Sequence, residues 1–73
     1  MSSIVAIGEH ERVRGFAFAG VRVAAAEDRR QVRAAWDALP GEVALVILTP
    51  AAHTVLRSEL EGRDLPLYAV MAP

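Results

Sequence analysis

The chain has 73 residues, an apolar share of 53% and a net charge of −1, which together favour one globular domain, residues 1–73, with a true core. All cationic residues are arginine, and nine acidic residues balance them, so we expect no basic face and no nucleic-acid partner. There is no cysteine, and the longest apolar run, about six residues, is too short for a membrane-spanning helix. The N-terminus has no cationic region before Glu9, so we expect no signal peptide and an intracellular, soluble domain.

Four short apolar runs predict strands: residues 3–8 (SIVAIG), 21–25 (VRVAA), 43–48 (VALVIL) and 67–71 (LYAVM). Several of these runs are apolar on both faces, as expected where helices cover both sides of a parallel sheet. Because helix-like segments alternate with the runs, the sequence predicts an α/β fold with right-handed crossovers.

Three helices are expected between the strands. The first covers residues 9–19, and Gly20 supplies the left-handed residue that ends it, with Phe16 and Val21 in contact as in a Schellman ending. The second follows Asp28, an N-cap with Gln31 at capping-box spacing. The third follows Thr49, an N-cap with proline at the next position, and ends near Gly62.

Two residues of the first helix suggest a contact surface. Gly15 costs about 1 kcal/mol relative to alanine in a helix interior, so we interpret it as permitting close approach to the sheet or to a partner, or else as a tolerated weak spot. Phe18 falls about 140° from the centre of the helix's apolar stripe, given the helical periodicity. It therefore points outward, unless the helix frays and Phe18 folds inward.

Motifs for catalysis, cofactors or metals are not found in the sequence. The glycines before and within the first helix lack the G-x-G-x-x-G spacing that a dinucleotide needs, and the turn there carries Glu9 and Glu11, which would repel phosphate. A phosphorylatable receiver domain would need an aspartate after the third strand and a lysine, whereas Thr49 stands there and the chain has no lysine. His10 and His53 lie on separate elements and are interpreted as surface residues, because a zinc site needs three or four converging ligands.

The expected topology leaves part of the sheet uncovered. With four strands in the order 2-1-3-4, typical of three-layer flavodoxin-like and Rossmann-like sheets, the first helix lies on one face and the other two on the opposite face. The first helix alone then covers its face, and the area over the third and fourth strands lies bare. Exposed apolar areas of this kind mark interaction sites, so the residues alone predict an interaction module.

The sequence also resembles the F subunit of the prokaryotic V-type (A/V-type) rotary ATPase. The stretch IVAIGEHERVRGFAFAGVRV has the family's strand ending in Ile7-Gly8, the acidic turn at Glu9, and then Gly15-Phe16 and Ala19-Gly20-Val21. Further along, VALVILTPAAHTVLR resembles the family's third strand with threonine opening the next helix, and LPLYAVMAP resembles its last strand.

The resemblance implies a non-catalytic central-stalk protein without a cofactor. Such a protein docks on the coiled-coil D subunit of the stalk, reaches the catalytic hexamer through it, and couples ATP turnover to transport of protons or sodium ions. It is cytoplasmic and peripheral to the membrane. The alternative is a self-associating module that kept the fold without the motor role and forms a homodimer through the bare face or the edge of the fourth strand.

From the geometry, the expected contact residues are Gly15, Phe18, Tyr68 and Met71. Family members usually continue past the last strand into a C-terminal helix linked to regulation. This chain ends at Pro73, so we expect either a shortened form of a longer chain or a short variant that pairs with itself.

Overall fold

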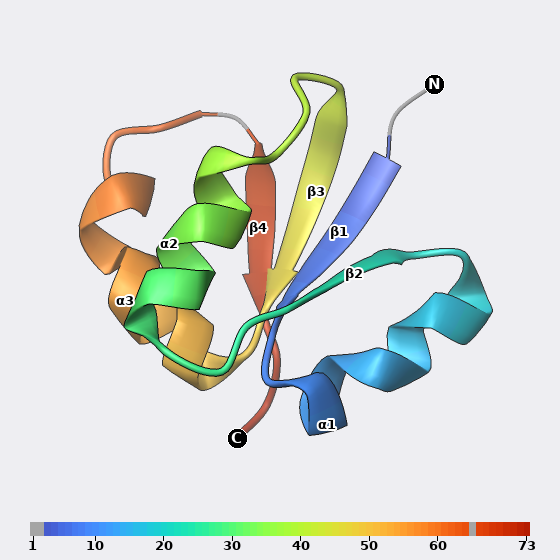
Figure 1. Ribbon diagram of the computed structural model, residues 1–73. Coiled ribbons are helices and arrows are strands. Elements are labelled where there is room, and N and C mark those ends of the chain that lie inside the picture. Colours follow the sequence, from blue (N-terminus) through green and yellow to red (C-terminus); the bar gives the residue numbers. More distant parts are fainter. Residues whose placement is uncertain (1–2, 65) are drawn as a thin grey trace.

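The apolar runs form one parallel sheet in a computed structural model that describes residues 3–64 and 66–73 (Figure 1). Its strands are β1 (Ser3–Gly8), β2 (Arg22–Ala25), β3 (Val43–Leu48) and β4 (Leu67–Val70). Their order in the sheet is β2-β1-β3-β4 and every pairing is parallel. The predicted strands, strand order and α/β class are confirmed.

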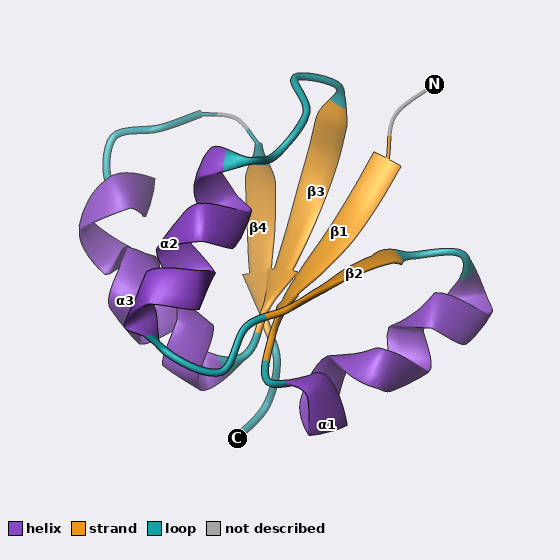
Figure 2. Cartoon of the chain, in the orientation of Figure 1, coloured by secondary structure: helices purple, strands orange, loops and turns teal. Residues whose placement is uncertain are grey.

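The strand register assigns each side chain to one face of the sheet. Val5 is paired with Val46 and Ile7 with Leu48, and since side chains alternate along a strand, all of these point to one face. The two helices on that face are α2 (Arg29–Asp37) and α3 (Pro50–Leu60), which lie side by side (Figure 2).

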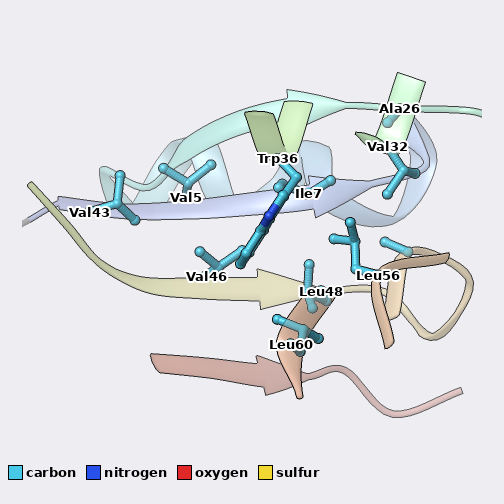
Figure 3. Packing of buried hydrophobic residues seen from close by; sticks show 11 residues of the cluster. Val5, Ile7, Ala26, Val32, Trp36, Val43, Val46, Leu48, Leu56 and Leu60 are labelled. Carbon is cyan, nitrogen blue, oxygen red and sulfur yellow. The ribbon is translucent and has the colours of Figure 1, made fainter. Parts of the chain in front are cut away.

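Helix α2 supplies the large aromatic residue of the core. Trp36 is 8% exposed and lies between Ile7 of β1 and Val46 of β3 (Figure 3). Around it, Val32 of α2 and Leu56 and Leu60 of α3 complete the cluster. Burial of such side chains stabilises the fold by about 1.5–3 kcal/mol each, so this face holds the main core.

Side-chain caps fix where α2 and α3 begin. The carboxylate of Asp28 accepts a hydrogen bond from the Gln31 amide at 2.9 Å, and the Thr49 hydroxyl accepts one from the Ala52 amide at 3.3 Å. Both predicted N-caps are therefore confirmed. The Gln31 side chain accepts from the amide of Glu27, at 2.8 Å, one residue before the position that a capping box would use.

The predicted helix over residues 9–19 is wrong in its second half. An α-helix, α1, covers only His10–Val13, and a 3-10 helix, η1, covers Arg14–Ala19. Val13 is fully buried, whereas η1 has no buried residue among its six. A short helix in water depends on packing of an apolar face, and η1 lacks that support, so it takes the tighter form common at helix ends.

The end of η1 follows the predicted Schellman geometry. Gly20 adopts φ 79°, and its amide donates to the carbonyl of Ala17 at 3.2 Å. The amide of Val21 donates to the carbonyl of Phe16 at 3.3 Å, the longer-range bond that defines this motif. Gly62 also has a positive φ, 75°, but α3 ends differently: its C-cap Glu61 is extended, and the amide of Arg63 donates to the carbonyl of Leu60 at 3.3 Å across a turn.

Candidate partner-binding surfaces

Phe18 is the most exposed of the large apolar side chains that the structure describes. It lies on η1, beside β2, and is 95% exposed, so the prediction that it points outward is confirmed. A phenylalanine buries on the order of 150–250 Å² when it is covered. In the isolated chain this apolar area stays in water and does not stabilise the fold. Because a partner that covered it would gain that stabilisation, Phe18 is a candidate anchor residue for binding.

Gly15 lies one turn before Phe18 but does not approach the sheet. A Cβ atom placed on it would find no atom of the described residues within 4 Å. The interpretation of close approach to the sheet is therefore wrong, because η1 runs along the outside of the fold rather than across the strands. Close approach to a partner stays a prediction, and a shallow depression lined by Gly15 and Phe18 lies at this position.

Tyr68 and Met71 belong to the opposite edge of the sheet. Tyr68, on β4, is 44% exposed, and its ring stacks on that of His53 with centroids 5.8 Å apart. His53 was expected to be a surface residue, and this stacking makes it half-buried. The amide of Met71 donates to the carbonyl of Leu48 at 2.8 Å, which extends the pairing one residue beyond β4.

The four predicted contact residues therefore form two surfaces rather than one. Gly15 and Phe18 lie on η1 beside β2, whereas Tyr68 and Met71 lie on or beyond β4, and β1 and β3 separate these two edges. This separation follows from the strand order, in which β2 and β4 are the two edge strands, as the sequence predicted.

An apolar area of the sheet lies exposed on the side of α1, as predicted. Register aligns Ile4, Leu45 and Leu67 across β1, β3 and β4, and Ile4 and Leu67 are 40% and 62% exposed. Ile47 and Ala69 form the next row. We call these five residues the exposed sheet face. α1 and η1 pack mainly on β1 and β2, so they leave this area open to a partner.

A polar network at the carboxyl ends of the strands was not predicted. The Thr49 hydroxyl donates to the Glu9 carboxylate at 2.6 Å, and the His10 amide donates to the Glu27 carboxylate at 2.8 Å. The Arg12 guanidinium donates to the carbonyl of Ala72 at 2.6 Å. The turn after β1 is thereby joined to the segments that follow the other three strands of the sheet.

Gly8 and Thr49 pack against each other at the centre of this network. A Cβ atom on Gly8 would overlap Cγ2 of Thr49, so only glycine fits beside the fully buried threonine. The hydrogen bond from Thr49 lowers the pKa of the Glu9 carboxyl below its ordinary value. In the sequence, the one feature that could have indicated this network was the threonine, Thr49, that follows the third strand in place of an acidic residue.

The carboxyl edge does not fit a nucleotide. Its cavity measures about 140 Å³, and its charged lining consists of three acidic residues, Glu9, Glu27 and Asp28, and one arginine, Arg29. Ligand pockets usually measure roughly 300–1,000 Å³, and carboxylates would repel a phosphate. Within residues 3–64 and 66–73, no group of three or more histidine, cysteine or acidic side chains could hold a metal ion. In the same residues, no helix is both long and apolar enough to cross a membrane.

The strand order and the helices on both faces define a doubly wound α/β protein. The chain belongs to the family described as ATP synthase (F/14-kDa) subunit, whose sequence model matches residues 4–71. Its fold is similar to that of the F subunit of the V-type ATP synthase from Archaeoglobus fulgidus, with a TM-score of 0.63 and 18% identity over 97% of this chain and 98% of that one. No curated protein sequence matches the chain. The resemblance to the F subunit is thus confirmed.

Proposed function

We propose that the chain is a non-catalytic component of the central stalk of a V-type rotary ATPase. In this role it docks on the coiled-coil D subunit of the stalk, reaches the catalytic hexamer through it, and helps to couple ATP turnover to ion transport. The observation that carries the proposal is the family match over residues 4–71. As part of that complex, the chain is peripheral to the membrane on its cytoplasmic side.

The exposed residues around Phe18 support docking on a coiled coil. A coiled coil presents ridges of side chains with charged residues along its flanks. Phe18 offers an exposed aromatic anchor, the residue type that dominates binding energy at many interfaces. Around it, Glu11, Arg12 and Arg14 are exposed and can form the polar rim that interfaces require.

The test is to mix the chain with the D subunit from the same organism and measure the mass of the complex by light scattering during size-exclusion chromatography. We expect a complex of one chain with one D subunit. Phe18→Ser should weaken it by roughly tenfold or more, as for an interface anchor. Arg30→Ser, a change at an exposed position of α2, is the matched control and should leave binding unchanged.

A second candidate function is a self-associating module without the motor role. The observation that favours it is the charge-free sequence of β4 and its flanks, residues 65–73. Under this alternative, the chain would form a homodimer and the D subunit would leave its mass unchanged. Failure to bind the D subunit would contradict the stalk proposal whether or not the chain self-associates.

A further inference from the structure

The two edges of the sheet differ in how they are protected. Edge strands expose unpaired backbone groups, and proteins commonly blunt them with charged side chains or cover them. β2 carries the exposed Arg22 and packs against α1 and η1. All four residues of β4 are exposed, and no charged residue occurs from residue 65 to residue 73. β4 is therefore the open edge.

The backbone groups that β4 presents outward follow from its pairing with β3. The amide of Met71 donates to Leu48 of β3, so Met71 directs its N–H toward the sheet. Because N–H and C=O groups alternate in direction along a strand, those of Ala69 also face β3. The N–H and C=O groups of Tyr68 and Val70 then point away from the sheet and are free for a further strand.

We propose that β4 pairs in antiparallel fashion with β4 of a second copy of the chain, with Ala69 opposite Ala69 of that copy. The two-fold axis of such a pair is perpendicular to the sheet, so each face continues into the same face of the second copy. Two residues that lie opposite each other must therefore point to the same face. A shift of the pairing by one residue would break this condition, so only registers centred on a residue of β4 remain.

The outward groups select one of these registers. With Ala69 at the axis, Tyr68 lies opposite Val70 of the second copy, and both outward residues of each chain exchange N–H···O bonds. A register centred on Tyr68 would oppose Val70 to Pro66, which has no N–H. A register centred on Val70 would oppose Tyr68 to Ala72, whose carbonyl would then have to accept a second hydrogen bond in addition to that from Arg12.

The side chains brought together in this register are all uncharged, and only Tyr68 carries a polar group. On one face, Leu67 lies opposite Met71 of the second copy, and on the other, Tyr68 lies opposite Val70. Tyr68 and Val70 are 44% and 42% exposed in the single chain, so pairing removes apolar area from water. The exposed sheet face becomes continuous through both copies.

A second copy is the occupant that this edge fits best. Its β4 has the same length and lies between the same two prolines, at 66 and 73. Pairing with it also places no charged side chain beside residues 65–73, which carry none themselves. The pairing joins only two four-residue strands, whereas stable interfaces bury roughly 800 Å² per partner. We therefore expect a weak dimer with a dissociation constant in the micromolar range or above.

Sedimentation equilibrium of the isolated chain, from micromolar to millimolar concentration, tests the proposal. The dimer fraction should rise with concentration. Val70→Lys places a charge at the open edge and should weaken the dimer at least tenfold, whereas Ala17→Lys, on η1, adds the same charge elsewhere and should change nothing. A chain that stays monomeric throughout, or a dimer that Val70→Lys leaves unchanged, would overturn the proposal.

A cysteine variant tests the register, because the natural sequence contains no cysteine. Residues opposed in a non-hydrogen-bonded antiparallel pair have Cα atoms about 4.5 Å apart, within disulfide range. Ala69→Cys should therefore form a covalent dimer on mild oxidation, and the exposed Ala17→Cys should do so far more slowly. Equal rates would contradict the register. Loss of D-subunit binding in Val70→Lys would show that the D subunit, rather than a second copy, occupies this edge.

Discussion

At the scale of single residues, Thr49 has three roles. Its hydroxyl caps α3 through the Ala52 amide and donates to Glu9, and its methyl group packs over Gly8. A buried hydroxyl is costly unless it is hydrogen-bonded, and here both the donor and an acceptor function are used. The junction of β1, β3 and α3 therefore depends on one small side chain and on the glycine that leaves room for it.

Gly8→Ala should destabilise the fold. The new methyl group would overlap Cγ2 of Thr49, and overpacking of this kind costs about 1–3 kcal/mol of the free energy of unfolding. Gly15→Ala is the matched control, because the space around Gly15 is open. Urea unfolding of both variants measures the difference. Equal stability of the two would show that Thr49 moves aside without cost.

The Glu9 carboxyl makes the free energy of unfolding depend on pH in the acid range. Because Thr49 lowers its pKa in the folded state below the ordinary value of 4.5, the ionised carboxylate stabilises the fold above that value. This contribution is lost as pH falls through the lower, folded-state pKa. Wild type should therefore exceed Glu9→Gln in stability at neutral pH, and the gap should shrink below about pH 4, the usual range for this group.

Thermal unfolding across this pH range measures that gap. Thr49→Val removes the hydroxyl that contributes most to the lowered pKa of Glu9, and should therefore reduce the pH dependence of the Glu9 contribution; a backbone hydrogen bond and the charge of Arg12 still lower that pKa. Glu61→Gln, at an exposed position, is the control and should follow wild type throughout. A gap between wild type and Glu9→Gln that stays constant down to about pH 2, well below the usual range of a glutamate, would contradict this assignment.

At the scale of elements, the segment from α1 to η1 is held at its two ends. Val13 anchors it in the interior, and the Schellman bonds around Gly20 return the chain to β2. Between these points the residues of η1 are exposed or half-buried. Phe18 is thus presented on a segment that has no buried residue, which leaves it accessible to a partner.

Gly20→Ala should weaken this ending. Gly20 adopts φ 79°, a left-handed conformation that costs a residue with a side chain about 1–2 kcal/mol. Gly41→Ala is the control, since Gly41 is exposed and lies outside the positive-φ region. Chemical denaturation should show a loss of stability for Gly20→Ala alone. A comparable loss for both would contradict the assignment of the effect to the left-handed conformation of Gly20.

At the scale of the whole molecule, the turn after β1 connects the carboxyl ends of all strands. Its hydrogen bonds reach the segments after β2, β3 and β4 through Glu27, Thr49 and Ala72. These bonds link residues as far as 60 positions apart. The end of the chain is thereby tied to α1, beside which it lies (Figure 1).

Arg12→Gln should loosen this end without unfolding the protein. Removing the bond to Ala72 frees residues 71–73, so the amides of Met71 and Ala72 should exchange hydrogen faster, while global stability changes by less than about 1 kcal/mol because the bond is exposed. Hydrogen exchange followed by mass spectrometry measures this, with Arg30→Gln as control. Unchanged exchange at Met71 and Ala72 would show that the pairing of Met71 with Leu48 is sufficient to hold this end.

The sequence by itself determined the strands, the caps of α2 and α3 and the turn at Gly20, because each depends on neighbours a few residues away. It also indicated that Phe18 points outward and that part of the sheet lies bare.

The tertiary structure decided the rest. Glu9 and Thr49, 40 positions apart, meet only because β1 and β3 are adjacent. Gly15 faces open space because η1 lacks a buried face. Phe18 and Tyr68 lie at opposite edges, as the predicted strand order implies, but only the structure shows that Tyr68 stacks on His53 while Phe18 is left 95% exposed.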